Sequence, residues 1–252
     1  MNVLSDGNLN SIGHLKIWFV CFLILTSIIG CNKKELVSSN SENEFADWIK
    51  LEIPNGREAF AVVGDINKRL LVTTWTKGYY SDDKGLTWNE SHDFQGHILE
   101  LHERNDTVFA LISTEYLDKA GYRSVGICND YTTNFGLTWE SKNSRFYSQL
   151  TSRIGTALSD GGMMYQVKEN LTPVSPGSMS YCYNPSSVQK FEAFSWQDLD
   201  FPMKLRINNI HIDKNNFFYM ATSMGEFGIT NNFLGAKVGS PAIIYVSKKV
   251  LP

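Results

Sequence analysis

The stretch Ser81–Trp88 (SDDKGLTW) decides how this chain is read, because Thr132–Trp139 (TTNFGLTW) repeats it with Thr for Ser and Asn for Asp. In both copies the Asp or Asn side chain can accept backbone N–H groups of its own turn. The glycine supplies a backbone conformation that a Cβ would penalise, and the Trp begins the next strand with a large ring to bury. The octapeptides therefore predict two structural hairpin turns, and their defining residues are Ser81, Asp83, Gly85, Thr87, Trp88, Thr132, Asn134, Gly136, Thr138 and Trp139.

A calcium loop is the alternative use of such Asp and Asn side chains. One carboxylate per octapeptide is a poor cage for a cation that takes about six to eight oxygens. His97 and His102 have no Cys, Asp or His partner at ligand spacing. We therefore expect neither a metal nor a cofactor.

The octapeptides resemble the Asp-box, or bacterial neuraminidase repeat, of sialidase-like β-propellers. The resemblance implies an all-β propeller. Trp139 follows Trp88 by 51 residues and Trp196 follows Trp139 by 57, near the known length of a propeller blade. Apolar runs paired across Gly, Asn or Asp turns predict hairpins throughout. We expect about four four-stranded repeats over residues 46–252, closed, open as an arc, or truncated. Two packed antiparallel sheets are the alternative fold.

Three strands per repeat can be placed from the apolar runs. The expected strands are 57–63, 69–74 and 79–80; 97–102, 107–112 and 125–131; 153–158, 163–167 and 179–183; and 206–212, 217–222 and 226–230. A long loop is expected at 168–178. The octapeptide decays to Ser195-Trp196 in the third repeat and to Thr230-Asn231-Asn232 in the fourth. Trp48–Ile53 is predicted to complete the last repeat, and Ala242–Lys248 to add to it or to the edge.

The first thirty residues predict export. The apolar run 17–30 is too short to span a bilayer comfortably and is typical of a signal peptide. Residues 28–31 (IIGC) resemble a bacterial lipobox, which implies cleavage before Cys31 and a lipid on its sulfur. An ordinary signal peptide or an N-terminal anchor is the alternative. Asn32 favours the outer over the inner membrane, and residues 31–45 read as a flexible tether.

The net charge argues against a nucleic-acid partner, and the cysteine content raises the question of a disulfide. The net charge is −3 and no basic cluster follows the tether, so nucleic acid is excluded as a partner. Cys128 and Cys182 can pair in an oxidising compartment. Because they lie on matching strands of successive repeats, we expect buried thiols instead.

Ligands of propellers usually bind where the innermost strands begin, opposite the hairpin turns. Arg57, His97, Arg153 and Arg206 open these strands, and arginine forks suit carboxylates and phosphates. Solvated arginines at strand ends are the alternative, and Arg153 falls out of phase with the others. Trp75 and Tyr116 lie at corners of the same face, where aromatic rings can stack on a sugar or on a partner chain.

The resemblance to sialidases implies a glycoside hydrolase as one alternative. Sialidases have six blades, however, and their Phe-Arg-Ile-Pro motif is met here only by Leu51–Pro54, with Glu in place of Arg. We therefore expect no catalytic residues. The expected function is a lipid-anchored module of the bacterial envelope that binds a protein or a glycan. A sialidase-type hydrolase and an assembly factor for a membrane complex are the alternatives.

Overall fold

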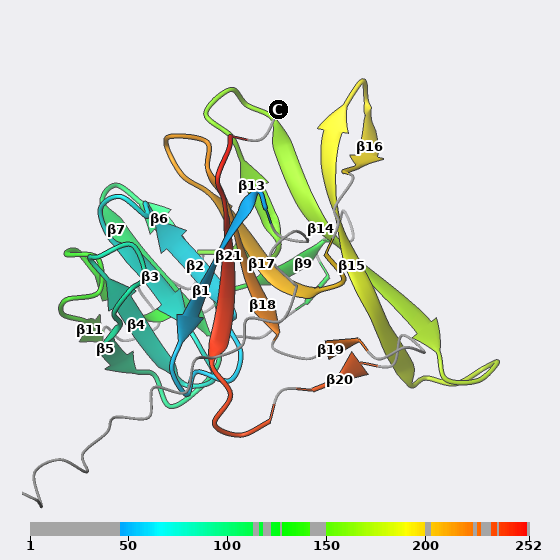
Figure 1. The fold of residues 1–252 in the computed structure, drawn as a ribbon, viewed down its shortest axis with the longest axis horizontal. Coiled ribbons are helices and arrows are strands. Elements are labelled where there is room, and N and C mark those ends of the chain that lie inside the picture. The colour runs from blue at the N-terminus through cyan, green and yellow to red at the C-terminus, as the bar shows by residue number, and fades with distance from the viewer. Residues whose placement is uncertain are drawn as a thin grey trace, which may run out of the picture. The chain divides into compact units, whose positions relative to one another are not determined.

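The computed structural model describes residues 46–112, 116–117, 122–126, 128–141, 150–199, 203–223, 226–227, 233–235 and 237–250. The predicted signal peptide, Cys31 and the tether lie outside these ranges. Within them every regular element is a β-strand, and no helix has the length and apolarity that a membrane span requires. The described strands include four four-stranded antiparallel sheets, which confirms the all-β expectation and contradicts the two-sheet alternative (Figure 1).

The first two sheets confirm the first two predicted repeats. Their strands pair in chain order, apart from a short insertion between β7 and β10. The bounds are β2 Ala61–Gly64, β3 Leu70–Thr73, β4 Lys77–Ser81 and β5 Asn89–Asp93 in the first, and β6 Ile98–Arg104, β7 Thr107–Ile112, β10 Cys128–Thr132 and β11 Glu140–Ser141 in the second.

The third sheet corrects the predicted loop at 168–178. Its strands are β13 Thr156–Leu158, β14 Met164–Pro173, β15 Tyr181–Glu192 and β16 Ser195–Asp198. The β14–β15 hairpin runs on through a polar stretch in which Asn170 Nδ2 donates to Pro185 O and Asn184 Nδ2 to Thr172 Oγ1. Such a ribbon has no apolar face to reveal it in the sequence. The surviving Ser195-Trp196 pair opens the fourth strand, β16.

The fourth sheet joins the two ends of the described chain. Its order is β1 (Trp48–Ile53), β21 (Ala242–Ser247), β18 (Phe218–Ser223) and β17 (Arg206–Ile212). Every residue of β1 pairs with β21, from Trp48 opposite Ser247 to Ile53 opposite Ala242. The prediction that this segment completes the last repeat is confirmed, and Figure 1 shows blue β1 beside red β21.

The predicted third strand at 226–230 is wrong. β19 (Glu226–Phe227) pairs instead with β20 (Phe233–Leu234) in a hairpin of its own. β21 takes the third place, paired with β18 on one edge and β1 on the other, and all six of its residues are buried. The opening of the fourth octapeptide, 230–232, lies outside the described residues.

A small sheet was not anticipated. β8 (Tyr116–Leu117), β9 (Arg123–Val125) and β12 (Ser152–Arg153) form three strands, so Arg153 belongs to this sheet and not to the third repeat. Cys182 is an exposed, free thiol, which contradicts the expectation of a buried one. The side chain of Cys128 lies outside what is described.

The two octapeptides form the predicted turn hydrogen bonds. Asp83 Oδ1 accepts from Thr87 N at 2.9 Å, and Ser81 Oγ accepts from Gly85 N at 2.9 Å. The second copy repeats both bonds with Asn134 and Thr132. A Cβ on Gly85 would lie 2.8 Å from Leu51 of β1, and one on Gly136 would lie 2.7 Å from Leu71 of β3. Each glycine therefore also lets its turn pack on a neighbouring sheet.

Hydrogen bonds between the innermost strand of one sheet and the second strand of its neighbour hold the sheets together. Ala59 N, just before β2, donates to Thr222 O of β18 at 3.1 Å, which ties the first repeat to the last. Thr73 Oγ1 donates to Ile98 O at 2.9 Å and ties the first to the second. Apolar clusters fill the layers between these sheets, and the one between the first and last sheets contains Leu51, Ile53, Val62, Leu70, Tyr219 and Ile244.

Candidate functional site

Three of the predicted site residues come together in one cluster with Phe60. The Arg57 guanidinium carbon lies 4.2 Å from the centre of the Trp75 ring. Trp75 meets His97 edge to face at 4.4 Å between ring centres, and Phe60 stacks on His97 at 5.0 Å. We call Arg57, Phe60, Trp75 and His97 the aromatic cluster. Its contacts combine a cation–π pair with aromatic packing, so the four side chains orient one another.

Local backbone structure explains how the aromatic cluster forms. Arg57 has a positive φ of 63° and its N–H donates to Ser240 O at 2.8 Å, which fixes its entry into β2. Trp75 lies in the tight turn that Thr74 N closes on Lys77 O at 2.8 Å. His97 directly precedes β6. Trp75 remains 39% exposed, so part of its ring is available to a partner.

The other two predicted arginines stack on tyrosines of their own. The Arg206 guanidinium lies 3.9 Å from the centre of the Tyr183 ring, and that of Arg153 lies 4.1 Å from the centre of the Tyr122 ring. The structure therefore distributes the expected ring of positive charge over three separate cation–π pairs. The side chain of Tyr116 is not described.

Glu58 makes polar contacts that were not anticipated from the sequence. Its Oε1 accepts from Asn208 Nδ2 at 3.0 Å and lies 3.9 Å from Arg206 Nη1. Asn208 also lines a cavity of about 370 Å³ with Tyr122, Trp196 and residues of β14. Asn208 lies two positions after Arg206, and this spacing could have indicated that both side chains lie on the same face of the strand. The bulge in β17 between Ile207 and Asn209 breaks the alternation from which such a prediction is made.

Glu100 and Asn209 form a polar pair between two innermost strands, in which Asn209 is buried and Glu100 is half-buried. Asn209 Nδ2 donates to Glu100 Oε2 at 2.7 Å and to Leu99 O at 3.0 Å, while its Oδ1 accepts from Gly155 N at 2.8 Å. Each strand has a bulge at this point, between Ile98 and Glu100 in β6 and between Ile207 and Asn209 in β17. Burial raises the pKa of Glu100 to about 8, against a smaller lowering by Asn209, so this carboxyl is protonated at neutral pH.

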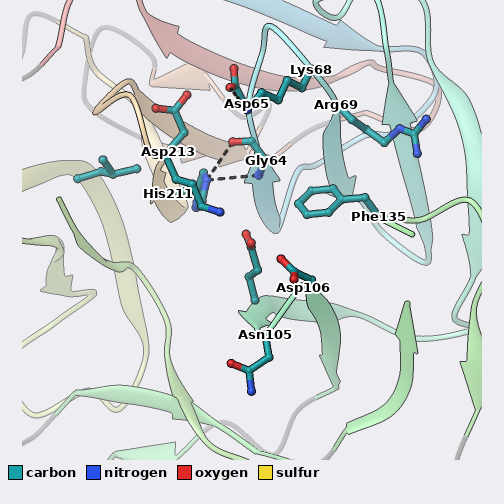
Figure 2. Close-up of a pocket in the computed structure, with 12 residues that line it drawn as sticks. Gly64, Asp65, Lys68, Arg69, Asn105, Asp106, Phe135, His211 and Asp213 are labelled. Atoms are coloured by element: carbon teal, nitrogen blue, oxygen red, sulfur yellow. Dashed lines mark hydrogen bonds and ion pairs between the residues drawn. The ribbon is translucent and has the colours of Figure 1, made fainter. Parts of the chain in front are cut away.

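A second, larger cavity lies where β2, β6 and β17 end, opposite the aromatic cluster along these strands. It has a volume of about 510 Å³ (Figure 2). This cavity was not anticipated, because the turns on this side were expected to have a structural role only. The lining residues are Gly64, Asp65, Lys68, Arg69, Glu103, Asn105, Asp106, Phe135, His211, Ile212, Asp213 and Lys214.

His211 forms part of the wall of this cavity. Its Nε2 lies 3.1 Å from Gly64 O and 3.3 Å from Gly64 N, as the dashed lines in Figure 2 show. Burial lowers the pKa of His211 to about 4, against smaller raising effects of Gly64 O and Asp213. The imidazole is therefore neutral at physiological pH and acts as a hydrogen-bonding wall rather than a cation.

No family model and no curated protein matches the chain. Among solved structures, an α-L-arabinanase of Penicillium chrysogenum complexed with arabinobiose is 10% identical over 81% of this chain and 99% of its own, with a TM-score of 0.41. YCF48 bound to D1 peptide is 10% identical over 76% of this chain and 72% of its own, with a TM-score of 0.27. Virginiamycin B lyase of Staphylococcus aureus is 8% identical over 75% and 74%, with a TM-score of 0.25. These neighbours are β-propeller proteins.

Proposed function

We propose that this protein is a non-catalytic β-propeller of four blades that binds a protein or a glycan at the bacterial cell envelope. The proposal includes the Asp-box family resemblance and a lipid anchor on Cys31, with the outer membrane as its location. The single observation that carries the binding role is the aromatic cluster. It collects on one face three residues that lie far apart in the sequence.

The chemistry of the aromatic cluster suits recognition. Trp and Arg are enriched among the residues that dominate binding energy at interfaces. The exposed part of the Trp75 ring offers a flat apolar surface to a sugar ring or an apolar side chain. Within the described residues Arg57 forms no ion pair, so its N–H groups remain for an acceptor on the partner. Because neighbours orient both side chains, little conformational entropy is lost on binding.

The glutamates on this side are used within the fold, which favours binding over hydrolysis. A glycosidase of the ordinary kind needs two carboxyl groups that flank the scissile bond. Glu58 is 12% exposed and is engaged by Asn208 and Arg206. Glu100 is half-buried and accepts a hydrogen bond from Asn209. Neither is placed to act on a substrate.

Trp75→Ala is expected to weaken partner binding by at least about tenfold, because an exposed Trp that anchors an interface contributes about 2 kcal/mol or more. Retention on a glycan array and capture of envelope proteins would be measured with the wild type and the variant. Phe194→Ala is the matched control, since Phe194 is 97% exposed but lies in the β15–β16 turn. Hydrolysis of a fluorogenic sialoside that both Arg57→Ala and Arg206→Ala abolish would instead establish the enzyme alternative.

Cys31→Ser is expected to abolish incorporation of labelled palmitate and to release the protein from the membrane fraction. The reason is that the lipobox resemblance assigns the lipid to this sulfur. Fractionation with and without globomycin measures the anchor independently of any binding partner. Unchanged labelling and fractionation in Cys31→Ser would show that the anchor is wrong and leave the binding proposal to its own test.

A further inference from the structure

The larger cavity is framed by three hairpin turns that the aromatic cluster does not contact. The β2–β3 turn and the β17–β18 turn are bonded to each other, because Asn215 Nδ2 donates to Asp65 Oδ2 at 3.0 Å. The β6–β7 turn consists of Asn105 and Asp106, whose φ values of 51° and 58° define a tight two-residue turn. Figure 2 shows Asp106 and Asn105 on one side of the cavity and Asp65, Lys68 and Asp213 on the other.

Three of the charged residues that line the cavity are already satisfied. Asp213 accepts from Tyr219 Oη, Asn215 N and Phe217 N. Arg69 makes a two-point contact with Asp82, at 2.5 and 2.9 Å, and donates to Asn134 O. Asp65 accepts from Asn67 N as well as from Asn215. These three residues are engaged within the protein, so a ligand would be bound by the other charged residues of the lining.

The remaining charges separate by sign across the cavity. Lys68 and Lys214 come from the two bonded turns, while Glu103 and Asp106 come from the end of β6 and its turn. All four residues are exposed. Lys68 makes only a long contact of 3.8 Å with Asp65, and the other three form no ion pair within the described part of the chain. The two bonded turns thus offer two lysines beside the engaged carboxylates of Asp65 and Asp213, the opposite side offers two exposed carboxylates, and each set is open to a ligand.

Part of the cavity lining is apolar and preformed, and we call this part the floor. Phe135, from the second octapeptide, and Ile212 contribute to it, next to the neutral imidazole of His211. Gly64 has a φ of 108°, and a Cβ there would lie 2.2 Å from Arg69 O and 3.0 Å from Phe135 Cε1. Only glycine lets Phe135 pack this close to the end of β2. The floor therefore needs no rearrangement to receive a ligand.

We propose that this cavity binds a small zwitterion of amino-acid to tripeptide size. Its ammonium group lies against Glu103 and Asp106, its carboxylate against Lys68 and Lys214, and its apolar part on Phe135 and Ile212. The volume of about 510 Å³ falls in the range of small-molecule sites. A ligand with one charge would leave one side of the cavity unpaired, so both ligand charges are needed for full affinity. This site is separate from the aromatic cluster and independent of the proposed partner there.

The dipeptide Gly-Phe tests the proposal on the unmodified protein by titration calorimetry at neutral pH and low salt. The Kd of Gly-Phe is expected to lie below about 10 mM. Acetylating the amino end should raise the Kd at least about tenfold, and amidating the carboxyl end should raise it by a similar factor. Equal binding of the three peptides would overturn the charge assignment. No binding of Gly-Phe up to about 10 mM would overturn the site.

Charge-reversal variants then assign each end of the peptide. Glu103→Lys with Asp106→Lys is expected to weaken Gly-Phe about tenfold or more, while the acetylated peptide, which is net anionic, binds no more weakly than to the wild type. Lys68→Glu with Lys214→Glu should weaken Gly-Phe, while the amidated peptide, which is net cationic, binds no more weakly than to the wild type. Lys84→Glu, an equally exposed change in the first octapeptide, is the control. If both pairs weaken all three peptides equally, the substitutions have changed the structure of the cavity rather than a matched charge, and the assigned orientation is wrong.

Discussion

Glu100→Gln is expected to stabilise the protein by several kcal/mol at pH 8 and to remove most of the loss of stability between pH 6.5 and 8. Glu100 has a pKa of about 8 in the folded protein, against 4.5 as its ordinary value. Between these values the unfolded chain has released a proton that the folded protein keeps, so the free energy of unfolding falls by about 1.4 kcal/mol per pH unit. Gln stays neutral and can still accept the hydrogen bond of Asn209.

The titration of two histidines also changes the free energy of unfolding with pH, so it limits the pH range in which the effect of Glu100 can be measured alone. His211, with its pKa lowered to about 4, and His102, whose pKa burial also lowers, make the protein less stable as the pH falls below 6.5. Between about 4.5 and 6.5 these effects oppose that of Glu100. Between 6.5 and 8 Glu100 acts without the two histidines, and a fall of about 2 kcal/mol is expected in the wild type.

Urea unfolding at several pH values measures this difference. Glu103→Gln is the matched control, because Glu103 lies on the same strand and is exposed. It should follow the wild-type profile. Parallel profiles of Glu100→Gln and wild type would show that the carboxyl is ionised in the folded protein at neutral pH, against the raised pKa.

Ile53→Ala is expected to lower the free energy of unfolding by about 2–5 kcal/mol, the usual cost of truncating a buried Ile. Ile53 is 0% exposed and packs in the cluster between the first and last sheets. Because β1 pairs along its whole length with β21, we expect the loss to appear in a single cooperative transition.

Glu52→Ala is the matched control for this variant. Glu52 is the preceding residue on β1, and its ion pair with Lys50 joins two exposed side chains, so little stability depends on it. Chemical denaturation followed by two probes, fluorescence and circular dichroism, measures both variants. An effect of Ile53→Ala no larger than that of Glu52→Ala would mean that β1 is not part of the cooperative unit.

Local chemistry made the hairpins predictable. The octapeptides place an Asp or Asn, a Gly and two hydroxyls at fixed positions, and each makes the contact that its type allows. The closing strand Trp48–Ile53 was also predictable, because the last repeat lacked a strand. The start of an innermost strand was the reason for choosing Arg57 and His97, and a loop corner was the reason for choosing Trp75. The structure brings the three side chains into contact.

The rest depended on pairing choices between distant segments. The segment 226–230 (EFGIT) directly follows the second strand of the last sheet, whereas the more apolar Ala242–Ser247 (AIIYVS) takes the third place from further along the chain. Bulges in β6 and β17 shift the alternation by one residue, which hid the Glu100–Asn209 pair. The large cavity needs three turns from separate sheets, and each turn alone looks like an ordinary surface connection.

The pairing of β1 with β21 brings the first and last described residues close together. Beyond the strands, Lys248 N donates to Asp47 O at 2.8 Å and Lys249 Nζ lies 2.7 Å from Asp47 Oδ1. A short linker joining these ends, with new termini at the exposed Lys84 turn, would give a circular permutant that keeps every strand pair. In the permutant, the first and last strands of the chain would pair in the first sheet, as β5 and β4, instead of in the last sheet, as β1 and β21.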